Sequence, residues 1–178
     1  MASFDLVAFD PVRDIQLVGA LEAPSIGIIQ LGFWVSDPNQ SILWNLPAAG
    51  QPRRDFLWEK TCFELFIGVK NEDFYREINL SDSGEWQAYQ FEEYRYPEHM
   101  PPTPAQDVEL VALQRTKFGL TSTIDINPFL HQYQLKMNDI FVGLTAVLNT
   151  ANKQHFFAMQ HSSPQADFHN KRDWLYQP

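Results

Sequence analysis

Two glutamates near the middle of the chain, Glu64 and Glu77, are the side chains best suited to chemistry. Each lies in a run of alternating apolar and polar residues, 61–69 and 74–80, which predicts two β-strands with one apolar and one polar face. A polar, glycine-containing turn between the runs predicts a hairpin that brings the two carboxylates close together. Such a pair could act as acid and base in glycoside hydrolysis, hold a cation, bind sugar hydroxyls, or face solvent beside basic partners.

Tryptophans surround this hairpin. Trp58 and Trp86 flank it, and Trp174 borders a loop near the C-terminus. Aromatic rings beside carboxylates and amides are typical of sugar sites, since the apolar face of a pyranose lies on the ring while its hydroxyls form hydrogen bonds. Asn79 supplies an amide on the same strand face as Glu77. Trp34 lies inside a strand-like run and is expected in the core.

Histidine and methionine raise the question of haem. His155, Met159 and His161 share one face of a strand by parity. Axial haem ligands approach the iron from opposite sides, so neighbours on one face cannot both serve, although Met100 or Met137 could supply a far ligand. Ordinary surface or hydrogen-bonded histidines are the favoured interpretation, and no cofactor or metal is expected.

Several function classes find no support. The chain has no G-x-S-x-G, no phosphate-binding glycine loop and no H-E-x-x-H, and its lone cysteine, Cys62, lies among bulky apolar residues as a small core side chain would. A net charge of −9 without a Lys/Arg cluster disfavours nucleic acid and anionic membranes as partners. The single cysteine and the absence of a signal-like N-terminus or a long apolar run lead us to expect a cytoplasmic location.

The remaining pattern is that of an all-β protein with one short helix. Strand-like runs are predicted at 4–9, 15–21, 25–36, 41–46, 61–69, 74–80, 85–94, 108–113, 117–126, 139–148 and 154–160. Asn127 as N-cap and Pro128 at the first helical position predict a helix over 129–137. Because turn residues separate these short runs, the sequence predicts one antiparallel β-sandwich or barrel domain over residues 1–178.

The blocks LWEKTCFELFI, FYREINLSDSGEWQAYQFEEYR and HSSPQADFH resemble the bacterial DOMON-like domain proteins, which are related to the family 9 carbohydrate-binding modules. The matching blocks span 58–95 and 143–169, with a vaguer match at 29–37, or about half the chain. The resemblance implies an antiparallel β-sandwich, immunoglobulin-like or jelly-roll-like, and a non-catalytic role. Members of the wider superfamily bind sugars or haem. The modules are usually secreted parts of larger glycanases, whereas this chain is expected to stand alone.

Family 9 modules clamp a saccharide end between two tryptophans, with a glutamate and an arginine nearby. By that resemblance Trp58 and Glu64 match the first tryptophan and the glutamate, Arg76 matches the arginine, and Trp174 is a candidate for the second tryptophan.

The sequence thus predicts a non-enzymatic binding module for a carbohydrate or a similar small polar ligand. Trp58 and Trp174 would stack on the ligand, Glu64 and Arg76 would orient it, and Glu77 and Asn79 would add polar contacts. The alternatives are a haem-binding electron-transfer domain, a glycoside-active enzyme using the two glutamates, and a protein-interaction scaffold using the loop 97–104. The segment 167–169 is interpreted as a structural corner rather than a site wall.

Overall fold

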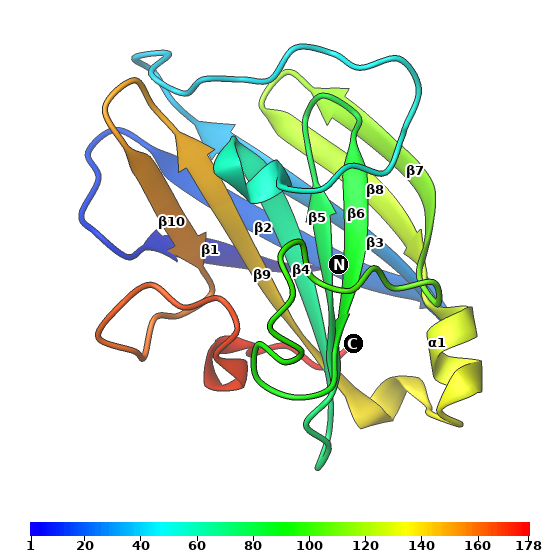
Figure 1. Ribbon diagram of the computed structural model, residues 1–178. Helices are drawn as coiled ribbons and strands as arrows, with labels where there is room; N and C mark the ends of the chain where they lie inside the picture. The colour runs from blue at the N-terminus through cyan, green and yellow to red at the C-terminus, as the bar shows by residue number, and fades with distance from the viewer.

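Ten antiparallel strands form one continuous, curled sheet in the computed structural model, which describes residues 1–178 (Figure 1). The strands are β1 (Ala2–Ala8), β2 (Gln16–Ser25), β3 (Ile28–Ser36), β4 (Cys62–Val69), β5 (Tyr75–Leu80), β6 (Trp86–Phe91), β7 (Glu109–Thr116), β8 (Gly119–Asp125), β9 (Ile140–Asn149) and β10 (Gln154–Ala158). The other elements are the helix α1 (Asn127–Gln132) and the 3-10 turns η1 (Leu57–Glu59), η2 (Met137–Asp139) and η3 (Lys171–Asp173). The prediction of an all-β fold with one short helix is confirmed.

The strand order is β6-β5-β4-β9-β10-β1-β2-β3-β8-β7. β1 joins the two halves of the sheet, because residues 2–6 pair with β2 while residues 7–8 pair with β10. The halves curl toward each other around one apolar core, in which Phe33 of β3 and Phe63 of β4 lie with ring centroids 5.0 Å apart. The finer prediction of a sandwich with two separate sheets is not shown.

Side chains alternate along the central hairpin as the sequence predicts. Phe63, Leu65, Ile67 and Val69 of β4, with Ile78 and Leu80 of β5, all belong to the main core. Cys62, Glu64, Phe66, Tyr75, Glu77 and Asn79 therefore lie on the opposite, outer face of the sheet. This outer face is nevertheless buried, since every residue of β4 and β5 is shielded from solvent.

Three irregular segments cover the outer face of this half-sheet (Figure 1). The segment containing η1 places Trp58 against Tyr89 of β6, with ring centroids 5.7 Å apart. The proline-rich loop runs antiparallel along the edge of β6 and pairs with it through hydrogen bonds such as Gln90 N–H to the Thr103 carbonyl. The C-terminal segment stacks Trp174 on Phe66 at 5.1 Å. These three segments, and not the strands, supply the walls of the site described below.

Three local predictions are wrong. The run 41–46 forms only an isolated bridge between Ile42 and Thr150, and no strand. The helix ends at Gln132, and its N-cap is Ile126 rather than Asn127. Trp34 is 37% exposed, because the core-facing residues of β3 are its odd-numbered neighbours.

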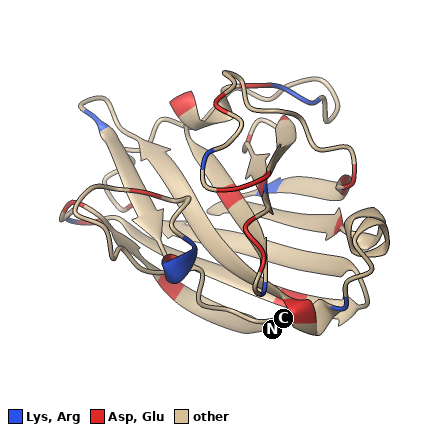
Figure 2. Cartoon of the chain, turned by 60° about the horizontal axis from the view of Figure 1, so that its bottom comes forward, with Lys and Arg blue, Asp and Glu red and all other residues tan.

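Charge is spread thinly over this fold. Acidic positions occur along loops and strand ends, and the basic positions between them do not gather into a patch (Figure 2). None of the helices has the length and apolar character needed to cross a bilayer.

Candidate functional site

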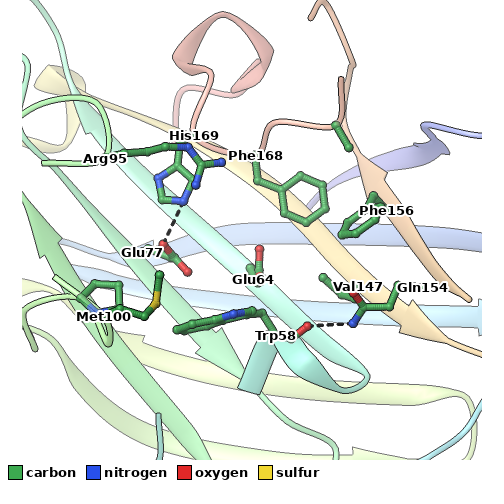
Figure 3. Close-up of a pocket in the computed structure, with 12 residues that line it drawn as sticks. Trp58, Glu64, Glu77, Arg95, Met100, Val147, Gln154, Phe156, Phe168 and His169 are labelled. Atoms are coloured by element: carbon green, nitrogen blue, oxygen red, sulfur yellow. Dashed lines mark hydrogen bonds and ion pairs between the residues drawn. The ribbon is translucent and has the colours of Figure 1, made fainter. Parts of the chain in front are cut away.

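A pocket of about 360 Å³ opens on the outer face of the half-sheet that contains the central hairpin (Figure 3). Its floor comes from four neighbouring strands, β5, β4, β9 and β10, and its walls from the three covering segments. The lining residues are Trp58, Glu64, Glu77, Arg95, Met100, Pro102, Val147, Gln154, Phe156, Ala166, Phe168 and His169.

Glu64 lies on the pocket floor with only 2% of its surface exposed. Its Oε2 atom accepts a hydrogen bond of 2.8 Å from the hydroxyl of Thr145, its direct register partner on β9. Burial raises the pKa of Glu64 to about 8, and the nearby Glu77 carboxylate contributes in the same direction. This carboxyl group therefore holds a proton well above the pH at which an exposed glutamate would lose it.

Glu77 is the diagonal neighbour of Glu64 across the β4–β5 ladder. The register places Glu64 opposite Asn79 and places Glu77 opposite Phe66. The Asn79 side-chain amide donates a 2.9 Å hydrogen bond to Glu77 Oε1. Burial raises the pKa of Glu77 to about 7, while Asn79 and Arg95 act in the lowering direction. Asn79 thus supports the carboxylate from behind and does not line the pocket.

His169 connects the second carboxylate to a network at the pocket wall. Its Nδ1 atom lies 2.7 Å from the Tyr75 hydroxyl, which already accepts a hydrogen bond from the Arg95 backbone N–H. We therefore assign the Tyr75 hydroxyl as the donor and Nδ1 as the acceptor, which places the ring proton on Nε2, 3.5 Å from Glu77 Oε2. Burial, followed by the charge of Arg95, lowers the pKa of His169 to about 3. The contact with Glu77 is thus not an ion pair.

Arg95 lies at the rim, with half of its side chain exposed. Its guanidinium donates to Asp167 Oδ1 at 3.0 Å, and the Tyr94 hydroxyl donates to the other Asp167 oxygen at 2.8 Å. Asp167 also accepts the backbone N–H of His169, which closes a tight turn. The segment 167–169 therefore forms the predicted corner and, through Phe168 and His169, also a wall of the pocket.

Aromatic rings form the apolar part of the lining. Trp58 packs edge-on against Phe56 at 5.4 Å, and its backbone carbonyl accepts a 3.1 Å hydrogen bond from Gln154 Nε2. Phe156 and Phe168 meet edge to face with centroids 5.9 Å apart. Apolar rings near convergent polar groups are the usual composition of a small-molecule site.

The structure brings together three of the six residues that the sequence singled out. Trp58, Glu64 and Glu77 line the pocket, and Asn79 lies directly behind Glu77. Arg76 and Trp174 lie outside it.

Arg76 belongs to the other face of the sheet. Its guanidinium makes a bidentate ion pair with Asp107, at 2.9 and 2.6 Å, and also donates to the Tyr133 hydroxyl at 3.1 Å. The strand alternation already separates it from Glu77, since successive side chains point to opposite faces. Arg95 is the arginine that lines the pocket.

Trp174 is buried behind the wall. Its ring stacks on Phe66, and its indole N–H donates a 2.8 Å hydrogen bond to the Phe168 carbonyl. It therefore anchors a wall residue and presents no free face to the pocket.

Four further lining residues were not predicted as ligand contacts from the sequence: Gln154, Phe156, Phe168 and His169. Gln154 and Phe156 share a face by parity on a predicted strand, and that signal could have selected them. The positions of Phe168 and His169 depend on how an irregular segment folds back, and no periodicity encodes this.

The residues present do not fit a haem site. Both ring nitrogens of His169 face protein groups, and His161 hydrogen-bonds the Val7 carbonyl through Nε2. Met159 packs in the main core. No group of three or more His, Cys, Asp or Glu side chains is arranged to hold a metal ion.

Comparisons with known proteins give a structural likeness only. No family model and no curated protein matches the chain. The fold is similar to the solved structure of a "putative carbohydrate-binding protein" from Bacteroides uniformis ATCC 8492, with a TM-score of 0.66 and 14% sequence identity. The likeness covers 97% of this chain and 84% of that one. At this level of identity it shows a shared all-β fold.

Proposed function

We propose that the protein is a non-catalytic module that binds a carbohydrate or a similar small polar ligand. The observation that carries this proposal is the placement of Trp58 beside Glu64, Glu77 and Gln154 in one pocket of about 360 Å³. A pocket of this size suits a ligand of one or two rings, and the floor combines an aromatic ring with fixed hydrogen-bonding groups. The described function of the Bacteroides uniformis protein supports the same class of ligand.

In this proposal Trp58 stacks on the ligand, and the two glutamates with Gln154 bind its polar groups. Arg95 at the rim takes the orienting role that the sequence gave to Arg76. The chain acts as one domain in which the facing halves of the curled sheet correspond to the two sheets of a DOMON-like or family 9 sandwich. A cytoplasmic location belongs to the same proposal.

Isothermal titration of the folded protein against a panel of mono- and disaccharides tests the proposal. We expect heat with at least one sugar, and a loss of affinity of about tenfold or more in Trp58→Ala. Trp34→Ala is the matched control, because Trp34 lies on β3 and does not line this pocket. Silence across the whole panel would refute the proposal.

Glycoside hydrolysis is the second candidate, favoured by two neighbouring carboxyl groups whose pKa values are raised by burial to about 8 and about 7. Non-catalytic binding is preferred because the similar solved structure is that of a "putative carbohydrate-binding protein". Release of chromophore from aryl glycosides by the wild type, abolished in Glu64→Gln, would reverse this judgement.

A further inference from the structure

The pocket floor presents two open carboxylate oxygens. Glu64 uses Oε2 for Thr145, and Glu77 uses Oε1 for Asn79. Glu64 Oε1 has no hydrogen-bond partner in the protein, and Glu77 Oε2 has only the His169 ring at 3.5 Å. Figure 3 shows both carboxylates in the middle of the pocket, between Trp58 and His169. These oxygens are free to receive donors from a ligand.

No protein cation forms an ion pair with these two glutamates, although the charge of Arg95 at the rim acts to lower the pKa of both. The Arg95 guanidinium is committed to Asp167 and Tyr94 at the rim. The amine of Lys171 donates to the backbone carbonyls of Glu72 and Asp73. The His169 ring is neutral, as its hydrogen bonding and burial require. A buried carboxylate pair that has no directly bonded counter-ion is stabilised either by keeping a proton or by receiving positive charge from a ligand.

The rest of the lining suits an ammonium group. Trp58 lines the same pocket as the carboxylates, and the electron-rich face of an indole attracts cations. An ammonium has three donors and no acceptor, which complements open carboxylate oxygens. A divalent metal ion would need further oxygen or nitrogen ligands, and no third acidic or histidine side chain is placed to complete such a site. The Gln154 amide nitrogen donates to the Trp58 carbonyl and to Asn149, so its Oε1 atom remains available to accept a hydrogen bond from a ligand hydroxyl.

We propose that the pocket binds an amino sugar, whose protonated primary amine lies between Glu64 and Glu77 while its ring packs on Trp58. This inference rests on the proposed binding function and narrows its ligand class. It predicts that the protein binds an amino sugar more tightly than a neutral sugar. This preference should disappear when the amine loses its charge or when Glu64 or Glu77 is replaced, while sugars still bind.

Four probes separate the two proposals: glucosamine, glucose, N-acetylglucosamine and ethanolamine, titrated into the intact protein at neutral pH. We expect glucosamine to bind about tenfold or more tightly than glucose and N-acetylglucosamine. Equal affinity for the three sugars would overturn the amine inference and leave the binding function standing. Binding of ethanolamine as tightly as glucosamine would support the amine site and contradict the carbohydrate function. No binding of any probe would overturn the amine inference, while the binding function is decided by the full panel of mono- and disaccharides.

The variants Glu64→Gln and Glu77→Gln test whether the two floor glutamates cause the preference for glucosamine over glucose. Each should reduce the ratio of glucosamine to glucose affinity toward one, because the amide keeps the shape of the side chain and loses its charge. Glu109→Gln on β7 is the control, since this exposed glutamate undergoes the same change in the other half of the sheet. A preference that persists in both floor variants would overturn the inference. The wild-type titrations decide it if a variant fails to fold.

Discussion

Glu64 and Glu77 take up protons when the chain folds, because burial raises their pKa values to about 8 and about 7 from the usual 4.5. The folded state then binds more protons than the unfolded state, so this contribution to stability is present at low pH and is lost as pH rises through 7 and 8. His169 acts in the opposite sense, since its pKa falls from 6.5 to about 3 and its contribution is complete above 6.5.

We therefore expect the free energy of unfolding to fall between pH 7 and pH 8, where the carboxylate contribution outweighs what remains of the histidine contribution. Urea denaturation at closely spaced pH values measures this slope. The double variant Glu64→Gln/Glu77→Gln should flatten the curve in that window, and Glu109→Gln should leave it unchanged. A wild-type curve that is flat or rises through the window would contradict the raised pKa values of the pair.

The two arginines provide a second test at this scale. Arg76 is 2% exposed and paired with Asp107 on the far side of the sheet from the pocket. Arg76→Met should lower the free energy of unfolding by about 3–5 kcal/mol, because it leaves a buried aspartate unpaired. Arg95→Met should change it by less than about 1 kcal/mol, since that pair is half exposed.

Ligand titration should give the reverse order, with Arg95→Met weakening binding and Arg76→Met leaving it unaltered at temperatures where the variant is folded. Restored stability in Arg76→Met/Asp107→Leu would confirm that the Arg76 loss comes from the unpaired charge. If Arg76→Met alone weakens binding, the sequence-based assignment of that arginine was right.

At the scale of elements, strand alternation was the most informative signal in the sequence. It correctly put Glu64 and Glu77 on one face and the core residues of β4 and β5 on the other. The same alternation places Arg76 on the face opposite Glu77. Arg76 was nevertheless predicted as a ligand contact, because its place in the sequence matches the arginine of the family 9 modules. The covering segments obey no period, so the sequence could not show that residues 160–178 fold back over β4.

The C-terminal segment depends on a missing side chain in β9. A Cβ atom on Gly143 would lie 2.3 Å from the Trp174 ring, so Trp174 fits against Phe66 only because position 143 is glycine. Gly143→Ala should destabilise the protein by about 1–3 kcal/mol and loosen the wall that Trp174 holds through the Phe168 carbonyl.

Hydrogen exchange of residues 160–178, together with ligand affinity, measures this loosening. The effect of Gly143→Ala should shrink in a Trp174→Ala background, because the clash is then absent. Additive effects in this double-mutant cycle would show that the strand and the ring do not interact.

For the molecule as a whole, continuity of the sheet could not be predicted from the strand list. The sequence of residues 2–8 gives no sign that this strand pairs with both β2 and β10. This double pairing joins the ten strands into one curled sheet. The amino-acid composition was more informative about the electrostatic potential around the molecule. The net charge of −9 is distributed without a basic patch, so a cationic ligand approaches an overall negative surface (Figure 2).

That electrostatic potential gives the last prediction. Association of glucosamine should slow several-fold when the ionic strength rises from about 10 mM to about 150 mM, because salt shortens the Debye length from roughly 30 Å to roughly 8 Å. Glucose carries no charge, so its association rate should stay constant over the same range. Stopped-flow tryptophan fluorescence with the two sugars measures both rates on one protein sample, with Trp58 as the reporting side chain. Equal salt sensitivity would assign the effect to the protein itself, and salt-independent binding of both sugars would remove the amine from the recognition chemistry.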